Sequence, residues 1–118
     1  MKINEEHFDR MFNVNVKGTF FLVKDCIDLL KKGGKDSTIC LITSFNGLYP
    51  DKNLGVHAMT KAALDNMVVW LADELRSDDI RVVAVAPGYV GTEKLLSFFE
   101  GKLDSLHPKK IGKPEEIA

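Results

Sequence analysis

Cysteine, long apolar runs and an excess of either charge are all scarce in this sequence of 118 residues. The two cysteines, Cys26 and Cys40, form no CxxC pair and no spaced framework, so we expect free buried thiols in a reducing compartment. No apolar stretch approaches the ~18 residues of a membrane-spanning helix, and residues 1–12 are too charged for a signal peptide core. We therefore expect a soluble, cytoplasmic protein without a membrane partner, while an organellar signal beyond residue 118 stays open.

The charges are also balanced and dispersed along the chain. The sequence has 16 Lys and Arg residues against 17 Asp and Glu residues, and neither sign forms a long block. This pattern excludes nucleic acid and anionic membrane surfaces as expected partners. His7, His57 and His107 match no metal-ligand spacing, so we expect no metal site.

Residues 5–32 show the periodicity of one long helix. The apolar residues that recur there at steps of three and four are Phe8, Met11, Phe12, Phe20, Val23, Ile27 and Leu30. A Gly-Gly pair follows them as a helix stop. Asn13, Asn15 and Gly18 disfavour helix in the middle of this pattern, so we expect a kink there or a side chain that serves another purpose.

Residues 38–44 and 80–87 are short runs rich in β-branched residues, without polar alternation. Such runs are typical of parallel strands that are buried on both faces. Between them, residues 57–77 carry an apolar stripe at helical spacing. The order helix, strand, helix, strand predicts a βαβ unit with a right-handed crossover.

Two parallel strands are too few for an independent domain, because so narrow a sheet leaves apolar faces and open edges uncovered. The final segment HPKKIGKPEEIA starts another helix at Pro114, and the sequence stops there. We therefore expect residues 1–118 to form a single partial α/β domain that is truncated at both ends.

Polar residues lie where both strands are expected to end. Ligands bind outside the carboxyl ends of the strands in open α/β sheets, and Ser44 and the segment PGYVGT lie at these ends. His57 and Lys61 are four residues apart at the start of the intervening helix, so their side chains project from the same face. A hydroxyl, a proton donor and an ammonium group can together polarise and protonate a carbonyl oxygen.

Five segments resemble motifs of the short-chain dehydrogenase/reductase family in their order and spacing. They are NVNVKG, ICLITS, HAMTK, RVVAVAPGYVGT and IGKPEEIA. The resemblance covers nearly the whole chain. It implies that Asn15 is the active-site asparagine and Ser44 the catalytic serine. It also implies that His57 and Lys61 occupy the two ends of the family's YxxxK signature and are catalytic residues.

The same resemblance places Lys61, Pro87, Gly88, Val90 and Thr92 at the cofactor. Gly88 is expected for its backbone geometry in any case. Thr92 is equally suited to cap the EKLLSFFEGKL segment that follows it, so its role has two interpretations.

The implied fold is a partial Rossmann-like, doubly wound parallel sheet that ends in a lid segment, residues 93–110. The implied activity is hydride transfer between NAD or NADP and a small carbonyl or alcohol, and the segments PGYVGT and IGKPEEIA favour the carbonyl-reductase branch. A homo-oligomer through the helices at 5–32 and 57–77 is implied for the full-length form.

The family's glycine-rich phosphate loop, the acidic residue for the adenosine ribose and the NNAG-like turn do not occur in this sequence. We therefore expect little dinucleotide affinity and no activity from residues 1–118 alone. The substrate and the choice between NAD and NADP stay open. A chain acting alone as an interaction fragment, docked onto a full-length relative through its helices, is a further and less favoured hypothesis.

His57 stands where the family has its catalytic tyrosine. An unperturbed imidazole titrates near ~6.5, and a nearby ammonium lowers that value, so Lys61 opposes an imidazolium acid. Two hypotheses follow: His57 is a working acid or base, or the site is inactive and the protein is a binding or subunit-assembly module. Tyr49 and Tyr89 are less favoured sources of a phenol, because neither has a lysine four residues on.

Overall fold

The computed structural model describes residues 3–98 and 111–117. The chain divides into two compact units, Met1–Ala86 and Pro87–Ala118. The helices and strands of the first unit are α1 (Glu5–Phe12), the π-helical segment η1 (Asn13–Gly18), α2 (Thr19–Gly33), β1 (Thr38–Ile42), α3 (Gly55–Glu74) and β2 (Arg81–Val85). Three 3-10 turns join them, η2 (Gly34–Asp36), η3 (Phe45–Gly47) and η4 (Arg76–Asp78). None of the helices within these described ranges is long and apolar enough to cross a membrane.

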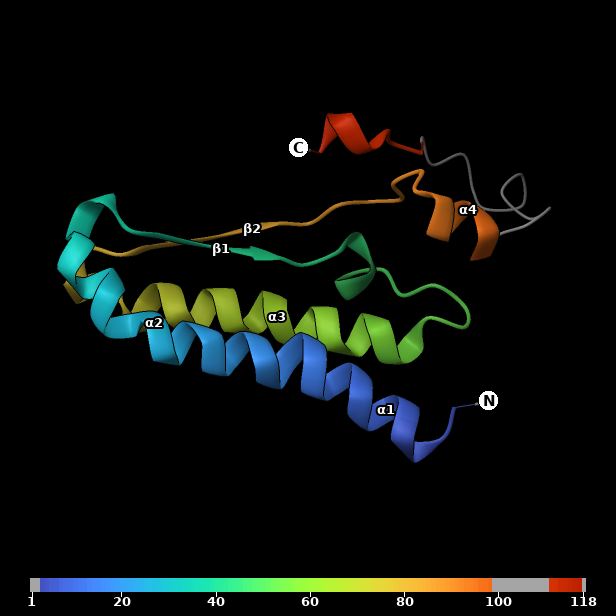
Figure 1. Ribbon diagram of the computed structural model, residues 1–118, viewed down its shortest axis with the longest axis horizontal. Helices are drawn as coiled ribbons and strands as arrows, with labels where there is room; N and C mark the ends of the chain where they lie inside the picture. The colour runs from blue at the N-terminus through green and yellow to red at the C-terminus, as the bar shows by residue number, and fades with distance from the viewer. Residues whose placement is uncertain (1–2, 99–110, 118) are drawn as a thin grey trace. The chain divides into compact units, whose positions relative to one another are not determined.

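The two strands are neighbours and run parallel (Figure 1). Thr38 pairs with Arg81 at one end of the ladder, and Ile42 pairs with Val85 at the other. The predicted order helix, strand, helix, strand in an α/β fold is therefore confirmed. The ladder brings the carboxyl ends of β1 and β2 to the same edge of the sheet, where the sequence predicts the site.

The predicted long helix is present, and its irregular part lies where the sequence indicates. The Asn4 side chain accepts a hydrogen bond of 2.9 Å from the backbone N–H of His7, which satisfies a donor at the start of α1. The run then passes through the π-helical turn η1 and continues into α2. Gly34 ends it with a positive φ of 53°, a conformation that glycine adopts without strain.

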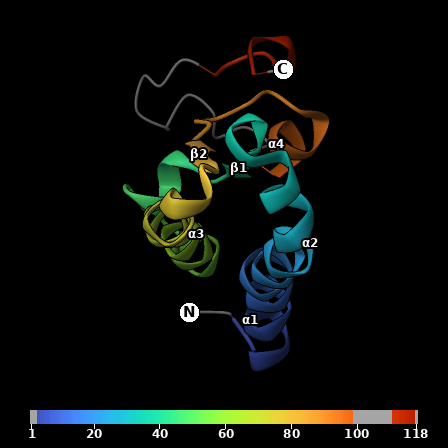
Figure 2. The ribbon, with the colours of Figure 1, turned by 90° about the vertical axis from the view of Figure 1, so that its left-hand side faces the viewer.

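The core lies between one face of the sheet and helices α2 and α3, which lie on the same side of the strands (Figure 2). Its buried members are Val23, Ile39, Leu41, Leu64, Met67, Leu71, Leu75 and Ile80. The side chains of α3 in this set recur every three or four residues, which is the stripe predicted for residues 57–77. This packing fixes the angle at which the first turns of α3 meet the end of β1.

The opposite face of the sheet is exposed within the first unit. Ile42, Val83 and Val85 are 57%, 45% and 40% exposed, and Cys40 beside them is also exposed. The predicted burial of the strands on both faces is therefore wrong for this unit, because its described helices cover a single face. The predicted buried thiol is likewise wrong for Cys40, whereas Cys26 is half-buried on α2.

The second unit contains α4 (Glu93–Phe98) and a 3-10 turn at Pro114–Glu116. Val90 and Gly112 form a parallel bridge, supported by a hydrogen bond of 2.9 Å from the Gly91 N–H to the Gly112 carbonyl. The helix predicted at Pro114 is observed as a single 3-10 turn. Residues 99–110 of the predicted lid segment lie outside the described residues.

Candidate active site

Lys61 connects α3 to the carboxyl end of β1. Its Nζ donates a hydrogen bond of 2.8 Å to the carbonyl oxygen of Ile42, the last residue of the strand. Burial lowers the pKa of Lys61 from its ordinary value, and the Asp65 carboxylate one turn further along α3 raises it by a smaller amount. The ammonium group of Lys61 is therefore held at the backbone of Ile42, which lies two residues before Ser44 in the sequence.

Ser44 has extended backbone and begins the turn η3. Its Oγ accepts a hydrogen bond of 3.2 Å from the backbone N–H of Asn46. A serine hydroxyl has two lone pairs and one O–H donor, so this contact leaves the O–H free to donate to a ligand. The cap thus orients the hydroxyl beside the strand end and keeps its donor available.

Gly47 lets this turn pack directly against α3. A Cβ added at this position would collide with Oδ2 of Asp65 and would lie 3.1 Å from the backbone nitrogen of Ala62. The turn that carries Ser44 is therefore in close contact with the helix segment that carries Lys61. Our reading of the sequence missed Gly47, although a glycine three residues after the serine is a signal that could have found it.

His57 lies in the first turn of α3, where the N-cap residue Leu54 makes no side-chain hydrogen bond. Its side chain is half-buried, and Nδ1 is buried with no hydrogen-bond partner among the described residues. Burial lowers the pKa of His57, and the Lys61 ammonium one turn away lowers it further. The predicted opposition between Lys61 and an imidazolium is confirmed in direction, and the larger cause is burial.

Asn15 projects from the π-helical turn onto α3. Its Nδ2 donates a hydrogen bond of 3.0 Å to Oγ1 of Thr60, which in turn donates one of 2.7 Å to the carbonyl oxygen of His57. Thr60 is completely buried and immediately precedes Lys61. The structure therefore brings Asn15 to the same helix as His57 and Lys61, while its predicted part in proton relay stays a prediction.

Thr60 was also missed, because a threonine inside a helix has no distinctive sequence signal. The hydroxyl of a helical threonine commonly bonds to the carbonyl one turn earlier, as Thr60 does to His57. What marks Thr60 out is the amide of Asn15, and that contact depends on how η1 packs against α3.

Pro87, Gly88, Val90 and Thr92 belong to the second unit. Oγ1 of Thr92 accepts a hydrogen bond of 3.3 Å from the N–H of Leu95, so Thr92 caps α4 as one of its two interpretations predicts. Gly88 lies outside the left-handed region and has open space where a Cβ would be, so the expected geometric need for glycine is wrong there. The cofactor contacts of these four residues remain predictions.

Tyr49 lies in the segment that follows Ser44, as the alternative source of a phenol requires. Its ring stacks on Phe45 with 4.8 Å between the ring centroids, and its side chain is 62% exposed. The other candidate, Tyr89, lies in the second unit, where its carbonyl oxygen accepts a hydrogen bond of 2.8 Å from the Gly112 N–H.

The described residues thus gather a serine, a lysine, a histidine and an asparagine around one helix and one strand end. Comparison with known sequences shows that the profile of the family described as short chain dehydrogenase matches residues 1–102. The chain belongs to the short-chain dehydrogenase family. The resemblance inferred from the five sequence segments is confirmed.

Individual members of the short-chain dehydrogenase family resemble the chain over most of its length. A chloroplastic NADPH-dependent aldehyde reductase-like protein of Arabidopsis thaliana is 40% identical over 104 residues, which are 88% of this chain and 37% of that protein. Dehydrogenase/reductase SDR family member 4 of Bos taurus is 34% identical over 125 residues, covering 100% of this chain and 44% of that protein. The chain therefore spans less than half the length of these relatives.

Solved structures that are similar to this chain confirm the Rossmann-like fold. The 3-ketoacyl-(acyl-carrier-protein) reductase of Brucella melitensis, complexed with NADH, superposes with a TM-score of 0.83 at 31% identity, over 97% of this chain and 48% of that one. ElxO with NADP bound gives a TM-score of 0.82 at 28% identity, over 95% of this chain and 48% of that one. The chain corresponds to part of a doubly wound sheet.

Proposed function

We propose that this chain carries the catalytic residues of an NAD(P)-dependent oxidoreductase that interconverts a small carbonyl compound and an alcohol by hydride transfer. The observation that carries the proposal is the bond from Lys61 Nζ to the Ile42 carbonyl, at 2.8 Å. This bond holds Lys61, which the resemblance aligns with the family's signature lysine, at the strand end that leads into Ser44. The relatives named as aldehyde and ketoacyl reductases, and the neighbours with bound NADH or NADP, support the same reaction.

The residues around Lys61 suit the nicotinamide ribose of such a cofactor. An ammonium group has three N–H donors, and the Ile42 carbonyl takes one of them, so two can be donated to the ribose hydroxyls. The bound cofactor would supply or accept the hydride. Nothing in the described residues selects between NAD and NADP, so the proposal covers both.

Ser44 and His57 are the groups proposed to contact the substrate. The Ser44 hydroxyl, fixed by the Asn46 N–H, donates a hydrogen bond to the substrate oxygen and orients the carbonyl. A donor that is already aimed at this oxygen stabilises the charge that develops on it as hydride arrives. Lys61 adds a positive charge on the same side of α3 and so favours negative charge on the oxygen.

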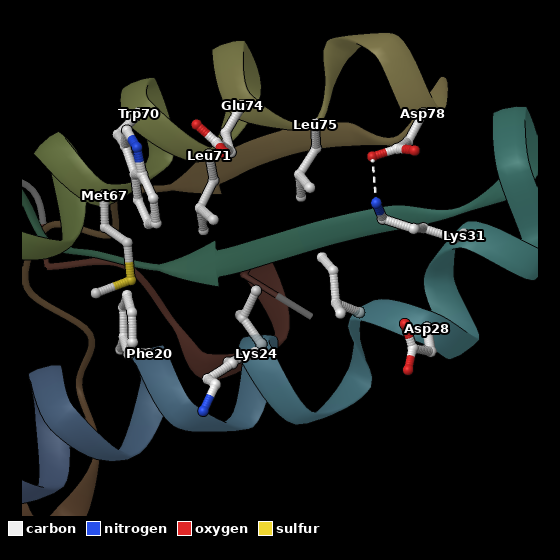
Figure 3. A pocket seen from close by; sticks show the side chains of 12 residues that line it. Phe20, Lys24, Asp28, Lys31, Met67, Trp70, Leu71, Glu74, Leu75 and Asp78 are labelled. Carbon is white, nitrogen blue, oxygen red and sulfur yellow. Dashed lines mark ion pairs between the residues drawn. The ribbon is translucent and has the colours of Figure 1, made fainter.

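We propose that the full-length form pairs with a second copy through the helices at 5–32 and 57–77. A groove of about 280 Å³ runs between α2 and α3 (Figure 3). Its apolar floor includes Val23, Met67 and Leu71, and the rings of Phe20 and Trp70 lie 6.0 Å apart across it. Both rings remain more than a third exposed, as expected for side chains that a partner covers.

A non-catalytic binding or assembly module is the second candidate, and the state of His57 favours it. Burial and Lys61 both lower the pKa of this histidine, so little imidazolium is present at neutral pH to replace the acid that a tyrosine would supply. His57→Tyr separates the two candidates. A rate that rises by several orders of magnitude supports a dormant site, whereas an unchanged or lower rate shows that histidine is used.

The decisive test is NADH- or NADPH-linked reduction of a panel of aldehydes and ketones by the protein isolated from its source. We expect measurable turnover that Lys61→Met lowers by ~10²-fold or more, because the ribose contact and the local positive charge are lost together. The matched control is Lys52→Met, since Lys52 lies exposed in the loop before α3 and should leave turnover unchanged. No turnover on any substrate with either nucleotide would refute the proposal.

A further inference from the structure

We propose that His57 works as a neutral imidazole, whose Nε2–H donates a hydrogen bond to a ligand oxygen, and not as an imidazolium acid. The identity of that ligand, a carbonyl or alcohol oxygen, rests on the function proposed above. The protonation state itself rests on three observations in this chain, each of which disfavours the charged ring.

The first observation is the place of His57 in its helix. α3 begins at Gly55, so His57 is its third residue, and Leu54 before it provides no side-chain cap. The N–H groups of a first turn carry partial positive charge and make the N-terminus unfavourable for a cation. A neutral histidine at a helix N-terminus can still polarise a carbonyl as a hydrogen-bond donor.

The second observation is the charge around the ring. Lys61 lies one turn along the same face, and its bond to the Ile42 carbonyl keeps the ammonium there. Of the neighbouring segments that pack on α3, η3 carries no charged residue. The segments α1 and η1 carry Glu5, Glu6, His7, Asp9, Arg10 and Lys17. The segments β2 and η4 carry Arg76, Asp78 and Arg81, and Asp78 is paired with Lys31.

The carboxylates of α1 do not offset the effect of Lys61 on the ring. Glu5, Glu6 and Asp9 are all exposed to solvent. Among the described residues, burial and Lys61 are the causes that act on the pKa of His57, and both lower it. The imidazolium therefore lacks a counter-charge in its own surroundings.

The third observation concerns Nδ1 of His57, which is buried without a hydrogen-bond partner among the described residues. An imidazolium and the Nδ1–H tautomer both place an N–H there, and a buried N–H without an acceptor is costly. The Nε2–H tautomer places only a lone pair at Nδ1 and keeps its single donor on the other nitrogen. This tautomer is the form that the burial of Nδ1 selects.

Ser44 supplies a second donor of the same kind. Its Oγ already accepts from the Asn46 N–H, so its remaining hydrogen-bonding capacity includes the O–H donor. Two neutral donors that reach the same ligand oxygen would form an oxyanion site, which binds a polarised carbonyl or an alkoxide without transferring a proton. His57 would then contribute to binding and polarisation over a pH range in which an imidazolium acid would be lost.

The test is a heteronuclear NMR titration of the ¹⁵N-labelled protein without cofactor or substrate, with the His57 ring identified by comparison with His57→Gln. We expect Nδ1 to give the shift of an unprotonated nitrogen and Nε2 that of a protonated one, throughout neutral pH. The midpoint should lie below ~6.5, the value of a free imidazole. An Nδ1–H tautomer would overturn the proposal. So would a midpoint for the His57 ring above ~6.5, the value of a free imidazole.

Lys61→Met provides the second measurement. Removing the ammonium should move the His57 midpoint upward while the Nε2–H tautomer persists, because the buried Nδ1 is unchanged. A midpoint that stays in place would contradict the role given to Lys61. Since neither spectrum requires turnover, a neutral Nε2–H ring in a protein without reductase activity would refute the proposed function and leave the state of His57 established.

Discussion

The Nδ2 of Asn15 donates to the hydroxyl of Thr60 across 3.0 Å, and this bond joins the π-helical turn η1 to the helix that carries Lys61. The Thr60 hydroxyl in turn donates a hydrogen bond of 2.7 Å to the carbonyl oxygen of His57. Two residues 45 positions apart in sequence thereby fix the first turns of α3 against the long N-terminal helix.

Thr60→Val should destabilise the chain, because it keeps the shape of the buried side chain but removes the acceptor of the Asn15 amide. We expect a loss of about 1–3 kcal/mol in the free energy of unfolding, measured with urea. Thr60→Ser is the control, since it retains the hydroxyl and loses only a methyl group. Equal stability of the Val and wild-type chains would show that the bond contributes nothing.

Gly47→Ala should loosen the contact between the Ser44 turn and α3. The added Cβ meets the Asp65 carboxylate and the backbone at Lys61 and Ala62, so we expect a loss of about 1–3 kcal/mol in thermal or urea unfolding. Gly55→Ala is the matched control, because Gly55 is the first residue of α3 and nothing lies within 4 Å of a Cβ added there. Similar effects of the two substitutions would contradict the close approach.

The acid side of the stability profile should carry a contribution from His57. Burial and Lys61 lower its pKa in the folded chain below the ordinary value of 6.5. Between the lowered value and 6.5 the unfolded chain binds more protons than the folded chain does, so the free energy of unfolding rises with pH in that window. Below this window the ring is protonated in both states, and the full loss in the free energy of unfolding that the lowered pKa of His57 causes has been reached.

His57→Gln should therefore flatten this part of the profile. The measurement is urea unfolding of both proteins from about pH 5 to about pH 8, the range in which a histidine changes its charge. His7→Gln, at an exposed position of α1, is the control for the removal of a histidine as such. Parallel profiles of the wild-type and His57→Gln chains would contradict the shift.

Trp70→Glu should weaken pairing between copies of the full-length form. The ring is 45% exposed beside the groove between α2 and α3, and an acid there would bury a charge in the proposed interface. We expect the dimer dissociation constant to rise ~10-fold or more in analytical ultracentrifugation, which is about 1.4 kcal/mol. Leu48→Glu, at a 70% exposed side chain outside the groove, should leave it unchanged.

Much of the architecture could be predicted because it depends on local periodicity. Steps of three and four residues found the long helix and α3, and the β-branched runs found both strands and their parallel pairing. The spacing of Ser44, His57 and Lys61 predicted a site at the carboxyl end of β1, and Lys61 is hydrogen-bonded to that strand end. These patterns are carried by neighbours in the sequence, so one chain is enough to read them.

The rest depends on contacts that no local pattern records. Gly47 and Thr60 matter because separate elements approach them closely, and the exposure of Cys40 follows from which face of the sheet α2 and α3 cover. The geometric need for Gly88 failed for the same reason, since open space there depends on the surrounding chain and not on the Pro-Gly pair itself.

The π-helical turn at Asn13–Gly18 acts as one residue of extra length inside a helix that is otherwise regular. In an α-helix each residue turns the chain by about 100°. Deleting one residue from this turn would therefore rotate the whole of α1 by about 100° about its axis, while α2 stayed packed against the sheet. The one extra residue in this turn thus determines which side of α1 faces α3.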